Sequence, residues 1–138
     1  MQTARVKWVG QEQFLALTPS GHAVPLDSGR GSNAAPGPME MLLVALGACT
    51  ATDVVGILAK KRQKLESLEV VVRGERAAEP PTVWVKLEIV YKLRGQLDEK
   101  AVRDAIELSE NKYCSVAATL RKTAPIAFHF EINPADGG

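Results

Sequence analysis

Residues 39–62 decide the fold, and they read MEMLLVALGACTATDVVGILAKKR. Nothing in this stretch breaks a helix except Gly47 and Gly56, which a helix tolerates, and apolar residues occur all around its circumference. A helix that is apolar on every face has to be surrounded by protein. In a domain this small, the chain's own sheet can cover one side, and a second copy of the chain is the economical cover for the other. The sequence therefore predicts a buried helix and a homodimer.

The same stretch raises the question of a membrane helix, because its apolar part, residues 41–59, is long enough to span a bilayer. Asp53 interrupts that part, basic residues follow on one side only, and the loop on the other side lacks an aromatic anchor. Four small or polar residues also dilute it: Gly47, Thr50, Thr52 and Gly56. We interpret the stretch as a core helix and expect no membrane partner.

The segments around this helix alternate between strand and helix patterns. Strand patterns occupy residues 3–9, 14–17, 22–26, 68–75, 83–91 and 126–132, and helix patterns occupy residues 98–110 and 113–122. Asp98 is suited to cap the first of these helices, in which Ala101, Val102, Ala105 and Ile106 form an apolar stripe. The order βββ-α-ββ-αα-β predicts a single α+β domain over residues 1–138, with the helices on one face of an antiparallel sheet.

Composition excludes several classes of function. The chain has 138 residues and a net charge of +1, which gives no general field to gather nucleic acid or an anionic membrane surface. The first residues alternate in polarity and show no secretory signal, so we expect a cytoplasmic protein. In that compartment two cysteines 65 positions apart are free thiols or a working redox couple rather than a permanent disulfide.

Metal and cofactor sites are not indicated by the sequence. Two cysteines and two histidines, at positions 22, 49, 114 and 129, show none of the close ligand pairs of a zinc site. His22 and His129 fall in predicted strands, where we interpret them as structural residues. The chain also lacks a phosphate-binding loop, a nucleophile elbow and a dinucleotide fingerprint. We therefore expect neither a metal nor a cofactor.

The cysteines themselves leave two interpretations open. Cys49 lies within the apolar helix, where a buried inert thiol is the ordinary case, and Asp53 one turn later disfavours its thiolate. Cys114 lies at the start of a predicted helix and close to Lys112, where amide groups and positive charge favour a thiolate. From these residues alone, a redox pair and two structural cysteines remain equal alternatives.

Two segments resemble signatures of the OsmC/Ohr superfamily. Residues 38–55, PMEMLLVALGACTATDVV, resemble its central-helix signature, and residues 108–116, LSENKYCSV, resemble its second-cysteine motif. With residues 4–9, the resemblance covers essentially the whole chain and is closest to the uncharacterised bacterial OsmC-like branch. It implies an OsmC-like fold, with antiparallel sheets, a long buried central helix and an intertwined homodimer whose active sites use both chains.

The resemblance also implies a chemistry for the two cysteines. The sulfur of Cys49 would attack a hydroperoxide, and Cys114 would resolve the product to a disulfide that a dithiol then reduces. The resemblance therefore implies a thiol-dependent hydroperoxide reductase, peroxiredoxin-like and acting on organic hydroperoxides in oxidative-stress defence. The alternative is a protein on the same scaffold that binds a hydrophobic small molecule in the dimer groove, with cysteines that only line the groove.

In the peroxidase branches, an arginine held by a glutamate keeps the attacking sulfur ionised, and the candidates here are Arg30 and Glu40. This sequence departs from the pattern, because Met39 occupies the place after the proline and Glu40 comes one residue later. The ordinary alternative for Arg30 is a solvated charged residue in a loop, with no role in the site. On a continuous helix, Glu40 and Cys49 would stand roughly 13 Å apart on opposite faces. If the two act together, a second chain has to supply one of them.

Overall fold

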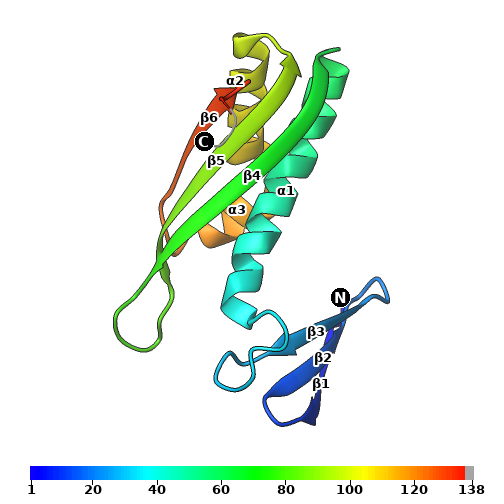
Figure 1. The fold of residues 1–138 in the computed structure, drawn as a ribbon, viewed down its shortest axis with the longest axis vertical. Helices are drawn as coiled ribbons and strands as arrows, with labels where there is room; N and C mark the ends of the chain where they lie inside the picture. Colours follow the sequence, from blue (N-terminus) through cyan, green and yellow to red (C-terminus); the bar gives the residue numbers. More distant parts are fainter. Residues whose placement is uncertain (136–138) are drawn as a thin grey trace. The chain divides into compact units, whose positions relative to one another are not determined.

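The computed structural model describes residues 1–135, and the chain divides into two compact units, Met1–Leu42 and the part from Leu43 onward. The described residues form two three-stranded sheets, one in each unit (Figure 1). The predicted α+β class is confirmed. The order of the elements predicted a single domain, and that expectation stays a prediction, because the contacts divide the chain into these two units.

The first unit is built on a sheet of β1 (Arg5–Gly10), β2 (Gln13–Leu17) and β3 (Ala23–Asp27). The strands follow one another in sequence order and every pairing is antiparallel, which is the hairpin and third strand that the alternating pattern predicts. After β3, the buried carboxylate of Asp27 accepts hydrogen bonds from the main-chain N–H groups of Gly29 and Ala34. Asp27 thereby shapes the loop in which Arg30 lies.

The long helix α1 runs from Pro38 to Lys60. Pro38 takes the first helical position, where its missing N–H costs nothing, and the Glu40 carboxylate accepts a 2.8 Å hydrogen bond from the Gly37 N–H. This contact is the return arm of a capping box. At the other end Arg62 adopts a left-handed conformation with φ of 57°, and the Gln63 N–H reaches the carbonyl of Leu58. A left-handed residue followed by a hydrogen bond of this kind is a common way for a helix to end.

The sheet of the second unit contains β4 (Lys64–Arg76), β5 (Trp84–Gln96) and β6 (Ile126–Ile132). β4 and β5 are antiparallel, as predicted, but both are longer than the sequence pattern indicated. β6 pairs with β5 in parallel, which departs from the expected antiparallel arrangement. The physical reason is the connection, because the helices between β5 and β6 return the chain to the end at which β5 begins.

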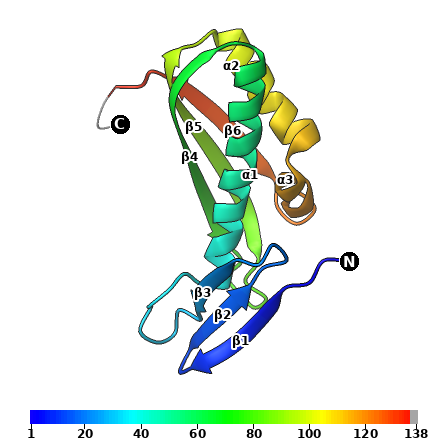
Figure 2. The same cartoon turned by 90° about the vertical axis from the view of Figure 1, so that its right-hand side faces the viewer.

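Three helices pack on one face of this sheet (Figure 2). They are α1, α2 (Glu99–Leu108) and α3 (Ser115–Leu120). Asp98 caps α2 by accepting from the Ala101 N–H at 3.0 Å, as predicted. The predicted apolar stripe of α2 is buried, and it meets the inward residues of β5, which are Leu87, Ile89, Tyr91 and Leu93.

Between α2 and α3 the chain makes a π-helical turn over Ser109–Tyr113, where the sequence predicted only a break at Asn111 and Lys112. The turn buries two polar residues, Ser109 and Glu110. π-helical turns are rare and often lie at functional sites. This one delivers Cys114 to the helix-covered face of the sheet.

Helix α1 buries a single stripe within its own chain, formed by Leu46, Thr50, Val54 and Leu58. Away from that stripe, Val44 is 58% exposed and Val55 is 47% exposed. Among the described residues, α1 is also the one helix long and apolar enough to cross a bilayer, a property shared by core helices of soluble proteins. The helix is therefore covered on one side, and its remaining faces stay apolar and open in the single chain.

Candidate functional site

Cys49 lies in the middle of α1, on the part of the helix that packs in the second unit. Its neighbour Thr50 belongs to the buried stripe, which places Cys49 at the edge of that stripe and leaves it half-buried. Asp53 follows four residues later, and residues at this spacing lie on one face of a helix. The local geometry therefore presents a sulfur and a carboxylate side by side.

Cys114 caps the N-terminus of α3. Its Sγ accepts a hydrogen bond from the Ala117 N–H at 3.4 Å, and its own main-chain N–H donates to the carbonyl of Ser109 at 2.8 Å. The side chain is buried, with 3% of its surface exposed. Both the capping role and the π-helical turn before it fix the direction in which this sulfur points.

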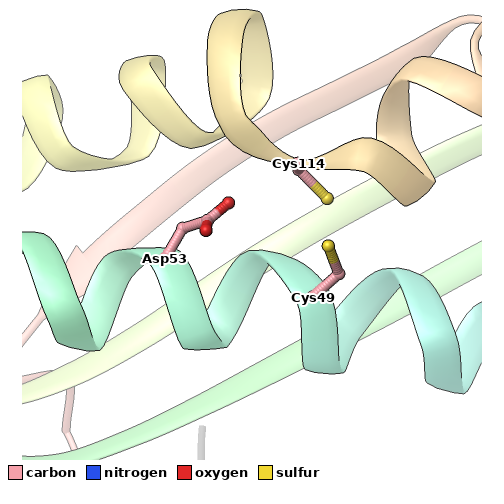
Figure 3. Close-up of side chains that lie close together, drawn as sticks. All are labelled: Cys49, Asp53 and Cys114. Carbon is pink, nitrogen blue, oxygen red and sulfur yellow. The ribbon is translucent and has the colours of Figure 1, made fainter.

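The structure brings the two cysteines together (Figure 3). The Sγ atoms of Cys49 and Cys114 and a carboxylate oxygen of Asp53 all lie within 4.8 Å of one another. Both cysteines are free thiols, and the two sulfurs point toward each other from α1 and from the start of α3. The distance is short enough for a disulfide to form after a small movement of the side chains. The attacking and resolving roles of the two cysteines stay predictions.

The ionisation of Cys114 differs from the expectation. Burial raises the pKa of its thiol well above the ordinary value, and the nearby Cys49 and Glu110 raise it further. The amide of Ala117 acts in the opposite direction, as the start of a helix should, but it is outweighed by desolvation. Lys112 lies over the ring of Tyr113, 5.3 Å from its centroid. The position of Cys114 at a helix start is visible in the sequence, whereas its burial depends on the tertiary fold.

A buried polar cluster lies directly behind the sulfurs, and its centre is Ser109. The Ser109 hydroxyl donates to Oδ2 of Asp53 at 2.9 Å and contacts the Thr50 hydroxyl at 2.9 Å. Thr50 also contacts the hydroxyl of Tyr91 on β5. Ser109 thus joins the π-helical turn to α1, and Thr50 extends the cluster to β5.

The cluster ends in a buried carboxylate. Glu110 has no exposed side-chain surface; it accepts a hydrogen bond from the Tyr91 hydroxyl and forms an ion pair with Arg121, whose nitrogen lies 3.4 Å away. Burial raises the pKa of Tyr91 above its ordinary value, and Glu110 adds to the shift. Within the described part of the chain, no buried side-chain nitrogen or oxygen lacks a hydrogen-bond partner. A fully paired network of this kind rigidifies its surroundings.

Sequence reasoning missed this cluster. Thr50 was noted only as a polar residue within the apolar helix. Ser109 and Glu110 were included in the second-cysteine motif, but no role was predicted for either of them. The available signal was the presence of polar residues at positions of α1 and α2 where the helical period requires apolar ones. A polar residue on a buried stripe needs a partner, and here the partners come from three separate elements.

Arg30 and Glu40 have other partners in the structure. Arg30 is 80% exposed on its loop, and its guanidinium lies 3.4 Å from the carboxylate of Glu12. Glu40 holds the Gly37 N–H at the start of α1. These contacts give both residues structural roles, of which the capping role of Glu40 was not foreseen. Their assignment to the site stays a prediction.

A pocket of about 560 Å³ borders the site on the Asp53 side. Its walls are largely apolar, with Ile57 from α1, Leu108 from α2 and Tyr113 from the π-helical turn, and Lys60 also lines it. The pocket gives solvent and small molecules an approach to Asp53.

Comparison with known proteins places these features in a family. The sequence profile of the family described as "OsmC-like protein" matches residues 30–129, which include both cysteines. The protein named YhfA, from Escherichia coli strain K12, is 42% identical over 130 residues, a match that covers 94% of this chain and 96% of that protein.

Solved structures show the same fold. A hypothetical protein from Aquifex aeolicus VF5 superposes with a TM-score of 0.82 at 29% identity, covering 97% of this chain and 98% of that one. An organic hydroperoxide resistance protein from Elizabethkingia anophelis superposes with a TM-score of 0.72 at 13% identity, covering 96% and 98% of the two chains. At that identity the second likeness shows the fold alone.

Proposed function

This chain belongs to the family of OsmC-like proteins, and on that premise we propose that it is a thiol-dependent hydroperoxide reductase that uses Cys49 and Cys114 as its redox pair. One observation carries the proposal: two free sulfurs from distant parts of the sequence lie within 4.8 Å of each other. Two structural thiols have no need to meet, whereas a redox pair does.

The reaction balances with the two sulfurs, a peroxide and a dithiol. The Cys49 thiolate attacks the distal oxygen of the hydroperoxide, the O–O bond breaks, and an alcohol leaves after taking up a proton. The sulfenic acid on Cys49 then condenses with the Cys114 thiol, which forms the S–S bond and releases water. A dithiol reductant returns both cysteines to thiols and is itself oxidised to a disulfide.

The different surroundings of the two cysteines support this division of roles. Cys49 is half-buried, so a peroxide can reach it, whereas Cys114 is buried and held by the Ala117 N–H. The raised pKa of Cys114 agrees with this assignment, because a thiol that stays protonated is a poor nucleophile for the first step. Cys114 needs to react only with a sulfenic acid that forms beside it.

The relatives support organic hydroperoxides as the substrate class. The protein from Elizabethkingia anophelis is named for organic hydroperoxide resistance, and it shares this fold. The apolar wall that Ile57 and Leu108 form beside Asp53 suits the organic part of such a substrate. A cytoplasmic location, where reducing dithiols are available, belongs to the same proposal.

We also propose that the working form is a homodimer. The faces of α1 that carry Val44 and Val55 are apolar and open in the single chain. A shallow apolar pocket of about 440 Å³ continues along α1 and β4 and includes Val44, Leu68 and Val70. A second copy of α1 is the cover that suits this surface. In such a dimer the Glu40 and Arg30 of one chain would serve the Cys49 of the other.

Turnover measurements test the proposal. The reduced protein should consume cumene hydroperoxide catalytically when a dithiol is present. Cys49→Ser should lose the activity, and Cys114→Ser should retain only the first, stoichiometric step. Asp104→Asn, a change at a half-exposed position of α2, serves as the control and should leave turnover unchanged. If the wild-type protein consumes peroxide no faster than a simple thiol, the enzyme proposal fails and the ligand-binding role in the dimer groove replaces it.

A further inference from the structure

Cys49, Asp53 and Cys114 form the one group of three metal-ligating side chains found among the described residues. We propose that, in the reduced protein, these three side chains bind a thiophilic divalent cation of the Zn²⁺ class, an activity separate from peroxide reduction. Two thiolates and a carboxylate are a donor set that suits Zn²⁺ and Cd²⁺ and disfavours Mg²⁺ and Ca²⁺.

The distances fit a single ion. Zinc binds cysteine sulfur at about 2.3 Å, so two sulfurs on one tetrahedral ion stand about 3.8 Å apart, and a carboxylate oxygen lies slightly closer. The three donor atoms here all lie within 4.8 Å of one another before any ion is bound. Rotation of the half-buried Cys49 side chain can narrow the remaining gap, while Asp53 keeps its hydrogen bond from Ser109.

The donors are also held in place from outside. Ser109 donates a hydrogen bond to Oδ2 of Asp53, which is how carboxylate ligands in metal sites are usually oriented. The Ala117 N–H holds the sulfur of Cys114, and the Ser109 carbonyl holds its main chain. The site is therefore assembled on two helices and a hydrogen-bonded turn before an ion arrives.

Sequence reasoning excluded zinc because it looked for close pairs among cysteines and histidines only. The close pair in this chain is Cys49 with Asp53, four residues apart on one helical face, and the third donor comes from 61 residues further along the sequence. His22 and His129 take no part in the group. A ligand set of two cysteines and one aspartate therefore lay outside that search.

Binding has two chemical consequences. Each ion that binds displaces the two thiol protons into solvent, with no oxidation or reduction of the protein. The ion and the disulfide also exclude one another, because both use the same two sulfurs. Three protein ligands would leave a fourth position for water. A bound ion would thus protect the thiols and withhold them from peroxide.

Zinc titration of the reduced, metal-free protein under anaerobic conditions tests the site without any peroxide. One Zn²⁺ should bind per chain and release two protons, and Cd²⁺ should give the near-ultraviolet absorption of a cadmium–thiolate bond. Cys49→Ser and Asp53→Asn should each weaken binding by at least the roughly 10–100-fold that loss of an outer partner costs. The matched control is Asp104→Asn, which changes a half-exposed carboxylate paired with Lys100 and should bind as the wild type does.

A second measurement guards against variants that fold poorly. In the wild-type protein, zinc should slow alkylation of Cys49 by iodoacetamide at least tenfold, and protein oxidised to the disulfide should bind no zinc. Unchanged zinc affinity in Cys49→Ser or in Asp53→Asn overturns the proposal, as does alkylation of Cys49 at the same rate with and without zinc. None of these readouts depends on peroxidase activity, so the two proposals stand or fall separately.

Discussion

Ser109 donates a 2.9 Å hydrogen bond from its hydroxyl to Oδ2 of Asp53, while its carbonyl oxygen accepts the main-chain N–H of Cys114 at 2.8 Å. One buried residue therefore fixes both the carboxylate on α1 and the cysteine that begins α3. The relationship exists because a π-helical turn places Ser109 against the buried stripe of α1. The geometry of the two sulfurs depends on this turn.

Replacing Ser109 with alanine should destabilise the fold and loosen the site. The change removes the donor to Asp53 and a partner of Thr50, and leaving buried polar groups unpaired costs about 1–3 kcal/mol. Chemical denaturation should show this loss in the free energy of unfolding. Ser115→Ala, an exposed position six residues later, is the control and should change that free energy by less than about 0.5 kcal/mol. Equal stabilities of the two variants would contradict the role of Ser109.

The elements that could be predicted from the sequence are those with a strong local period. Asp98 and the apolar stripe predict helix α2. The alternation of apolar and polar residues in β5 predicts its buried face, on which Leu87, Ile89 and Tyr91 point inward. Val85 belongs to the same alternation but is 41% exposed near the start of the strand. Local pattern fixes the face of an element, but the extent of its coverage depends on the neighbours that it meets.

A glycine on α1 gives a second test of packing. A Cβ added to Gly47 would lie 3.2 Å from Cγ2 of Val72 on β4, so this glycine permits close approach of helix and sheet within one chain. Gly47→Leu should therefore lower the free energy of unfolding by roughly 1–3 kcal/mol, and by more than Cys49→Ser does. Gly56→Leu is the matched control, because a Cβ there meets nothing within 4 Å. Equal melting temperatures for the two glycine variants would refute the close contact.

The open faces of α1 predict a dimer that charge can disrupt. Sedimentation at low micromolar concentration should show twice the chain mass for the wild type and a single chain mass for Val44→Lys or Val55→Lys, because a buried lysine is costly. Thr119→Lys, on an exposed position of α3, should remain dimeric. A well-folded wild-type monomer would remove both the dimer and the shared active site.

The pKa of Cys114 predicts how stability depends on pH in the metal-free, reduced protein. The folded state raises this pKa above the unfolded value of about 8.5, so it holds the thiol proton more tightly. That stabilisation is fully present below about pH 8.5 and is lost as the pH rises toward the folded pKa. Cys114→Ala has no thiol at this position and should not lose stability in this way. Above pH 8.5 the free energy of unfolding of the variant should therefore fall less steeply than that of the wild type, with slopes that differ by up to about 1.4 kcal/mol per pH unit. Parallel stability curves for the two proteins would show that the thiol is not desolvated.

The site was less predictable than the fold, for a physical reason. Cys49 and Cys114 were singled out from the sequence and lie close together in the structure, but their contact depends on the π-helical turn, which has no local signature. Glu40 illustrates the opposite case. It lies two residues after Pro38 in the first turn of α1, where an acidic residue can cap its own helix, and this local role was not predicted.

Mapping the product of one oxidation shows whether Cys49 and Cys114 are a working redox pair. The reduced protein is treated with one equivalent of cumene hydroperoxide, remaining thiols are blocked, and the digest is read by mass spectrometry. We predict a peptide crosslinked between Cys49 and Cys114, and in Cys114→Ser a sulfenic acid that stops on Cys49. Wild-type protein that keeps both thiols free while the peroxide persists would contradict the account.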